Sequence, residues 1–92
     1  MSVIDIHRSH SLDKEHAREA AEALARDLSK KFDLNYQWDG DVLRFSRSGV
    51  KGRLAIERSD LHMHLELGFL LRLFKSRIEQ EINAQLDDIT KA

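Results

Sequence analysis

Apolar and polar residues alternate in several short segments of the chain. In the first segment, Ile4 and Ile6 alternate with polar residues, and this two-residue period predicts a half-buried strand over residues 2–8. Four similar segments follow between residues 34 and 67, separated by the turn sequences DGD, SGVKG and RSD. Because these connections are short, we expect consecutive strands in this part of the chain to pair antiparallel.

Two longer segments repeat apolar residues at the three- and four-residue steps of an amphipathic helix. The first ends near Phe32, and Ser9 or Ser11 is expected to cap its amino end. The second is expected from about Phe69 to Thr90. The apolar positions are Ala17, Ala21, Leu24, Leu28 and Phe32 in the first helix, and Leu71, Phe74, Ile78, Ile82, Leu86 and Ile89 in the second.

Each predicted strand has one apolar face and one polar face, and each predicted helix has one apolar stripe. Only one face of the sheet therefore needs cover, and two helices are available to cover it. The prediction is an α+β two-layer sandwich in the order β-α-β-β-β-β-α, with an antiparallel sheet and both helices on one face. This layout is similar to that of helix-grip proteins. We expect residues 1–92 to form a single domain, because a chain of this length buries one modest core.

Composition limits the classes of function. Hydrophobic residues make up 41% and charged residues 34% of the 92 residues, as in folded globular chains. The formal net charge of -1 provides no overall basic surplus for binding nucleic acid. The absence of cysteine excludes a disulfide or a thiolate metal site. The N-terminus lacks the apolar stretch of a secretory signal and no apolar run has the length of a membrane span, so we expect a cytoplasmic protein.

Histidines gather on the polar faces of the first and last predicted strands. His62 and His64 are two residues apart, so both point to one face of the sheet. The first strand adds Asp5 and His7 on its own polar face. If these strands were neighbours, imidazoles and a carboxylate could converge on a metal such as zinc. Basic residues such as Arg53 share this face and oppose a bound cation, so a solvated sheet face is the favoured interpretation, and we assign no metal and no cofactor.

No motif of a catalytic or nucleic-acid-binding class stands out. Ser9 and Ser11 lie beside histidines, but helix capping and turn formation explain them better than a nucleophile does. With four glycines, the chain has no GxSxG, GxGxxG or Walker spacing. Tyr36 and Trp38 alternate onto the apolar face, whereas the basic residues of the next hairpin mostly lie on the other face. We therefore expect a non-enzymatic protein without a nucleic-acid partner.

Surplus apolar residues occur where the last strand meets the second helix. On a helical wheel, Phe69, Leu70 and Leu73 fall outside the sector of the core stripe. These residues either pack under neighbouring elements or in a dimer, or they form an exposed patch for a partner or an apolar particle. The candidate partner surface comprises Phe69, Leu70, Arg72, Leu73, Lys75 and Arg77.

Three segments carry a resemblance to a known family. They are IDIHRSHSL at the first strand, SGVKG at the central turn and LELGFLLRLFKSRIEQEI at the strand-helix joint. In this order they resemble the polyhydroxyalkanoic acid system proteins, small bacterial proteins named for genes near those of polyhydroxyalkanoate storage granules. The resemblance implies a bacterial cytoplasmic protein associated with granule metabolism, and it implies no reaction and no catalytic residue. The matching motif positions are Arg8, Ser9, His10, Gly49, Gly52, Gly68 and Phe69 to Leu71.

The sequence leaves three hypotheses about function. The first is a non-enzymatic accessory protein that acts at the polyhydroxyalkanoate granule surface, or on its coat proteins, through the candidate partner surface. The second is a carrier that holds a hydroxyacyl or fatty-acyl chain between the helices and the sheet. The third is a structural homodimer in which the same surplus apolar residues pair across a twofold axis. A carrier requires a cavity lined by residues such as Trp38, Phe45, Leu54 and Phe74.

Overall fold

The computed structural model describes residues 2–69 and 71–90. Within them, the elements follow the predicted order, with one 3-10 turn inserted before the last helix. The strands are β1 (Ser2–Ser9), β2 (Asn35–Asp39), β3 (Val42–Arg47), β4 (Val50–Ile56) and β5 (Asp60–Leu67). The helical elements are α1 (Lys14–Phe32), the 3-10 turn η1 (Leu71–Phe74) and α2 (Lys75–Thr90).

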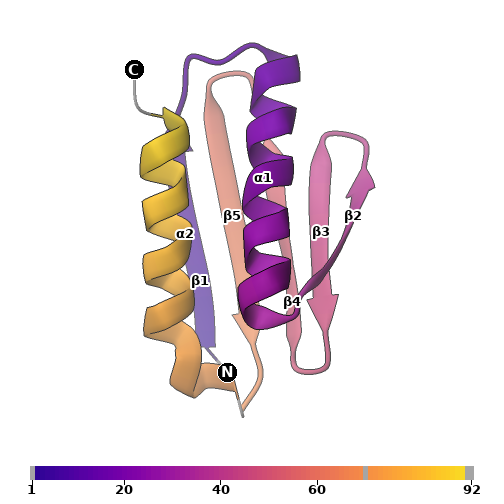
Figure 1. Ribbon diagram of the computed structural model, residues 1–92, viewed down its shortest axis with the longest axis vertical. Helices are drawn as coiled ribbons and strands as arrows, with labels where there is room; N and C mark the ends of the chain where they lie inside the picture. The colour runs from indigo at the N-terminus through magenta and orange to yellow at the C-terminus, as the bar shows by residue number, and fades with distance from the viewer. Residues whose placement is uncertain (1, 70, 91–92) are drawn as a thin grey trace.

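The strands form one antiparallel sheet in the order β1-β5-β4-β3-β2. The strands from β2 to β5 pair with their sequence neighbours, as the short connections predicted. The first strand pairs with the last, so that Asp5 lies opposite His64 and His7 lies opposite His62. Both helices cover the same face of the sheet, with α2 lying along β1 (Figure 1). The predicted α+β two-layer sandwich is therefore confirmed.

The core lies between the helices and the apolar face of the sheet. In β5, every second residue from Leu61 to Leu67 points to this face and is almost completely buried. Burying one such side chain contributes about 1.5–3 kcal/mol, so the alternating pattern fixes which face of each strand points inward. The buried helix residues are Ala17, Ala21, Leu24, Ala25 and Leu28 of α1, and Ile78, Ile82 and Leu86 of α2.

Glycines close the tight connections of the sheet. Gly40 has a φ of 64° and Gly49 has a φ of 85°, in the left-handed region that glycine adopts without steric cost. The Gly68 amide, at the end of β5, donates a hydrogen bond to the Gly49 carbonyl oxygen at 2.7 Å. A Cβ atom on Gly68 would lie 3.1 Å from that oxygen. This contact ties the β3–β4 turn to the point where the chain leaves the sheet.

Two residues of the IDIHRSHSL segment hold neighbouring elements together. Arg8 donates a hydrogen bond to Asp87, which joins the end of β1 to α2. The imidazole of His10 accepts a hydrogen bond from the Leu12 amide at 3.1 Å through Nδ1 and donates one to the Glu57 carbonyl oxygen at 2.9 Å through Nε2. These bonds use both ring nitrogens of a neutral imidazole. They connect the β1–α1 loop to the segment between β4 and β5.

The structure corrects the predicted start of the first helix. Asp13 is the N-cap residue of α1, and its side chain accepts a hydrogen bond from the His16 amide at 2.8 Å. The predicted caps, Ser9 and Ser11, lie before the helix, because β1 continues to Ser9 and a loop follows it. A carboxylate at this position satisfies an orphan amide as well as a serine does.

The second helix also begins later than its apolar repeat predicted. α2 starts at Lys75 and is preceded by η1, so Phe74 is 42% exposed and its predicted place in the core is wrong. A 3-10 turn advances about 120° per residue, so the wheel of a continuous α-helix does not hold through residues 71–74. Leu71 packs against the core as predicted. Neither helix among the described residues is long and apolar enough to cross a membrane.

Candidate functional site

The large exposed apolar side chains of the described residues lie at one end of the molecule. They are Phe69 at 72% exposure, Leu73 at 80%, Phe74 at 42% and Val3 at 40%. Phe69 follows the end of β5, the next two lie in η1, and Val3 lies in β1, which pairs with the end of β5. We call Val3, Phe69, Leu73 and Phe74 the apolar end. Several large apolar side chains exposed at one end of a protein are a feature of interaction sites.

The local backbone turns these side chains outward. The amides of Leu71 and Arg72 donate to the Gly68 carbonyl oxygen at 3.2 and 3.1 Å, which winds the chain into a tight turn directly after β5. Within this turn Leu71 packs against the core, and its Cδ1 lies beside Gly49, 3.6 Å from the position of a Cβ atom on that glycine. With Leu71 packed against the core, Leu73 projects to solvent.

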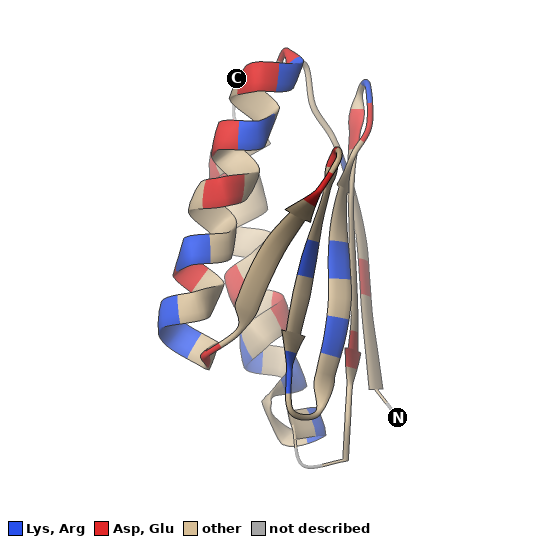
Figure 2. Ribbon diagram, turned by 90° about the vertical axis from the view of Figure 1, so that its right-hand side faces the viewer, with Lys and Arg blue, Asp and Glu red and all other residues tan. Residues whose placement is uncertain are grey.

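Basic residues border the apolar end. The Arg72 guanidinium lies over the Phe69 ring, 4.4 Å from its centroid, which is a cation–π contact. Arg77 is exposed and Lys75 is half-buried at the start of α2. Within the described part of the chain, none of these three cations forms an ion pair with a carboxylate. The basic residues of η1 and early α2 are visible as blue segments in Figure 2.

Most of the candidate partner surface is thus exposed. Phe69, Arg72, Leu73 and Arg77 face solvent, as an exposed patch requires. Leu70 lies outside the described residues. Sequence reasoning missed Phe74, because a continuous helix was assumed, and it missed Val3. The signal for Val3 was present, since alternation places it on the polar face of β1 with Asp5 and His7.

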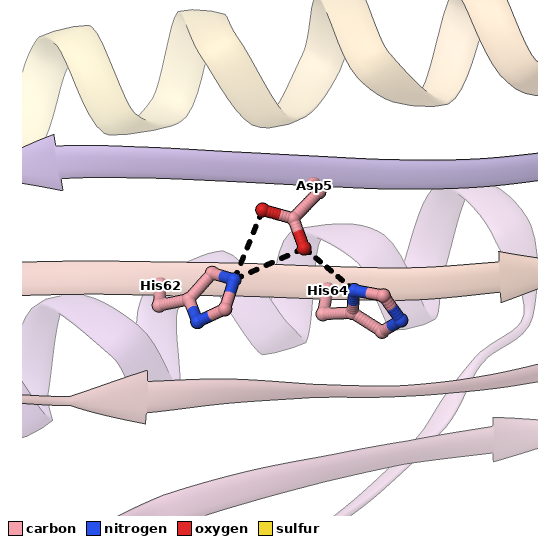
Figure 3. A group of neighbouring side chains, drawn as sticks. All are labelled: Asp5, His62 and His64. Carbon is pink, nitrogen blue, oxygen red and sulfur yellow. Dashed lines mark hydrogen bonds and ion pairs between the residues drawn. The ribbon is translucent and has the colours of Figure 1, made fainter.

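A second cluster lies on the outer face of the sheet, away from the helices. Because β1 pairs with β5, the Asp5 carboxylate lies between His62 and His64 (Figure 3). His62 Nε2 donates to the two carboxylate oxygens at 3.0 and 3.1 Å, and His64 Nδ1 donates to Oδ2 at 2.7 Å. Hydrogen bonds from His64, and next from His62, lower the pKa of Asp5 from 3.8 to about 2.

His7 extends this cluster along β1. Its ring stacks on that of His62 with centroids 3.9 Å apart and an interplanar angle of 14°. Its Nε2 lies 3.5 Å from Asp5 Oδ1, and its Nδ1 lies 3.2 Å from Asp60 Oδ2. The predicted position of the histidines on the polar face is confirmed. The pairing of β1 with β5 brings the side chains of the two strands together.

Basic residues occupy the other half of the same face. Arg44 on β3 lies opposite Arg53 on β4, and Lys51 lies on β4 two residues before Arg53 (Figure 2). Together with polar residues of β2 they line a shallow hollow of about 490 Å³. Like charges directly opposite each other in a sheet repel, and the ion pair of Arg44 with Asp39 at 3.0 Å relieves part of this repulsion.

The family comparison matches almost the whole sequence. A family model described as "Putative polyhydroxyalkanoic acid system protein" matches residues 4–89. The chain belongs to this family. The resemblance drawn from its three motif segments is therefore confirmed, and the family name links the chain to the polyhydroxyalkanoic acid system. Comparisons with curated proteins and with solved structures gave no match.

The residues that the carrier hypothesis requires around its cavity lie in different parts of the molecule. Phe45 and Leu54 are buried in the core cluster, whereas Phe74 is exposed at the apolar end. Trp38 lies at the edge of the sheet, where its Nε1 donates to Glu22 at 2.7 Å and the Arg18 guanidinium lies 4.0 Å from its ring centroid. The described residues therefore give no support to an acyl chain between helices and sheet.

Proposed function

We propose that this polyhydroxyalkanoic acid system protein is a non-enzymatic accessory protein that binds the surface of the polyhydroxyalkanoate granule through its apolar end. The observation that carries the proposal is the gathering of the large exposed apolar side chains at one end, bordered by Arg72, Lys75 and Arg77. The proposal assumes the bacterial cytoplasm as the compartment.

A polyester surface fits the chemistry of this end. Its aliphatic chain can cover Phe69 and Leu73, the two most exposed apolar side chains. Its ester carbonyl oxygens can accept hydrogen bonds from guanidinium and ammonium groups, which carry donors and no acceptor. The bordering cations lack carboxylate partners within the described residues, so their donors are free to make these bonds.

The expected affinity of one molecule is modest. Burial of apolar surface contributes about 25 cal/mol per Å², and four side chains present only a small area. Association also costs translational and rotational freedom, which offsets much of this gain. A granule presents many equivalent sites, so we expect weak binding by single molecules and a large number of bound molecules at saturation.

Co-sedimentation with polyester granules stripped of protein tests the proposal. We expect Leu73→Glu and Phe69→Glu to lose most of the bound fraction, because each places a charge where the polyester would lie. Both positions are exposed, so stability should change by no more than about 0.5 kcal/mol. Gln37→Glu is the matched control, since it makes the same charge change at an exposed position on β2 and should bind like the wild type.

Three results would contradict the proposal. Leu73→Glu that is folded and binds stripped granules as the wild type does would remove the apolar end as the contact. Binding to coated granules alone would identify a coat protein as the partner. Sedimentation of the wild type as a dimer that Leu73→Glu dissociates, without any loss of granule binding, would assign the apolar end to a second copy of the chain.

A further inference from the structure

We propose that Asp5, His62 and His64 form a binding site for a divalent transition metal of the zinc type on the outer face of the sheet. The proposed site does not depend on granule binding, and Asp5 shares its face of β1 with Val3 of the apolar end. One ligand atom from each residue lies within 4.8 Å of the other two. The three side chains come from two neighbouring strands and converge on one point (Figure 3).

The donor set suits zinc. Imidazole nitrogen and carboxylate oxygen are common zinc ligands, at about 2.0–2.2 Å from the ion. Around a tetrahedral ion such donors lie about 3.3–3.6 Å from one another. The present separations from Asp5 oxygens to His62 Nε2 and His64 Nδ1 are 3.0 and 2.7 Å. Each histidine nitrogen therefore needs to move away from the Asp5 oxygen by less than about 1 Å to admit the ion.

The backbone positions these donors before any ion binds. His62 and His64 point the same way because they are two residues apart on one strand. Register pairing places Asp5 directly opposite His64. Strand-borne ligands of this kind are more precisely held than ligands on loops. On binding, the ring protons that His62 and His64 now share with Asp5 would move to the opposite ring nitrogens, which face away from the carboxylate.

Groups around the three ligands complete the site. His7 stacks on the His62 ring and fixes its orientation, while Asp60 accepts a hydrogen bond from His7. Arg53 lies opposite His64 on the neighbouring strand β4, and its positive charge would repel a bound cation. The negative charges of Asp5 and Asp60 offset this repulsion. The fourth coordination position is left to solvent, as in zinc sites that are open to ligands.

Calorimetric titration of the untagged full chain with ZnCl₂ tests this site. We expect one ion per chain with a micromolar dissociation constant. His64→Gln and Asp5→Asn should each weaken binding by at least about tenfold, because each removes one of three ligands. His16→Gln is the matched control, because it removes an exposed imidazole that contacts a single carboxylate, Asp13, on α1. It should bind zinc with the affinity of the wild type.

A second measurement does not depend on the folding of variants. In the wild-type protein, zinc should shift the ring-nitrogen resonances of His62 and His64 and leave those of His10 and His16 in place. Binding weaker than millimolar would overturn the proposal, and so would an equal loss of affinity in His16→Gln and His64→Gln. Zinc-dependent shifts at His16 in place of His62 and His64 would also overturn it.

Discussion

Structural contacts account for several of the motif positions. Gly49 and Gly68 approach each other at the end of the sheet, with a hydrogen bond of 2.7 Å between them. Arg8 joins β1 to α2, and His10 uses both ring nitrogens to connect two loops. Residues that join elements in this way stabilise the fold, and none of these four needs a catalytic role to explain it.

Gly52 gives the most direct test of a structural glycine. A Cβ atom there would lie 2.1 Å from Leu65 Cδ2 and 2.6 Å from the His64 carbonyl oxygen. We expect Gly52→Ala to lower the free energy of unfolding by about 1–3 kcal/mol, the usual effect of overpacking a core. Urea unfolding followed by circular dichroism measures this change.

The sign of the effect separates this account from a simple propensity effect. Without a clash, alanine would stabilise a strand by about 0.5–1 kcal/mol relative to glycine. Ser46→Ala on the exposed face of β3 is a control that should stay within about 0.5 kcal/mol of the wild type. A Gly52→Ala protein as stable as the wild type, or more stable, would contradict the close packing of β4 on β5.

At the level of elements, charged groups connect the two helices. Lys31 of α1 lies 3.0 Å from Glu81 of α2 and 3.5 Å from Asp27 of its own helix. Within the described residues, the buried Oδ2 atom of Asp27 has no hydrogen-bond partner. Burial raises the pKa of Asp27 above its usual 3.8, and the neighbouring Glu81 carboxylate raises it further. The ionised form of Asp27 therefore weakens the contact between the helices.

This pKa shift predicts the effect of Asp27→Asn on stability. A raised pKa means that the folded chain binds the proton more tightly, so the contribution of Asp27 to stability is lost as pH rises from about 3.8 through its folded pKa. We expect Asp27→Asn to unfold with a higher free energy than the wild type at neutral pH, by up to about 1 kcal/mol. The difference should shrink toward about pH 4.

Urea unfolding over this pH range measures the difference. Asp88→Asn makes the same charge change at an exposed position of α2 and should show almost no pH-dependent difference from the wild type. A wild type more stable than Asp27→Asn at neutral pH would mean that the ion pair with Lys31 outweighs the burial of the carboxylate.

The sequence predicted elements better than their ends. Alternation and helical repeats gave every strand, both core stripes and the layer arrangement, because burial of one face dominates the free energy of each element. The ends depend on local contacts that the repeats do not contain. The carbonyl of Gly68 winds residues 71–74 into a 3-10 turn, and this turn moved Phe74 from the predicted core to the surface.

The candidate sites divide in the same way. The helical wheel placed Phe69 and Leu73 outside the core stripe but left open whether they are buried by neighbouring elements or exposed, and the structure shows both side chains exposed. The convergence of Asp5 on the two histidines could not be derived, because it depends on β1 pairing with β5 across more than fifty residues of sequence. Hydrophobic periodicity sets the face of a strand but not its neighbour.

For the molecule as a whole, three surfaces of different chemistry lie on one small scaffold. The apolar end lies where β5 passes into η1, the histidine cluster lies on β1 and β5, and basic residues cover β3 and β4. Phe69 and Leu73, which lie beyond the end of β5, can contact a particle while the basic residues on β3 and β4 remain in water. We therefore expect one fixed orientation of the protein on the granule.

Hydroxyl-radical footprinting of the chain bound to protein-free polyester granules tests this orientation most directly. Oxidation of Phe69 and Leu73 should fall severalfold on binding, because polyester would cover these side chains. Oxidation of Tyr36 and Trp38, at the far edge of the sheet, should be unchanged. Unaltered oxidation at Phe69 and Leu73, or protection of Tyr36 and Trp38 in their place, would contradict binding through the apolar end.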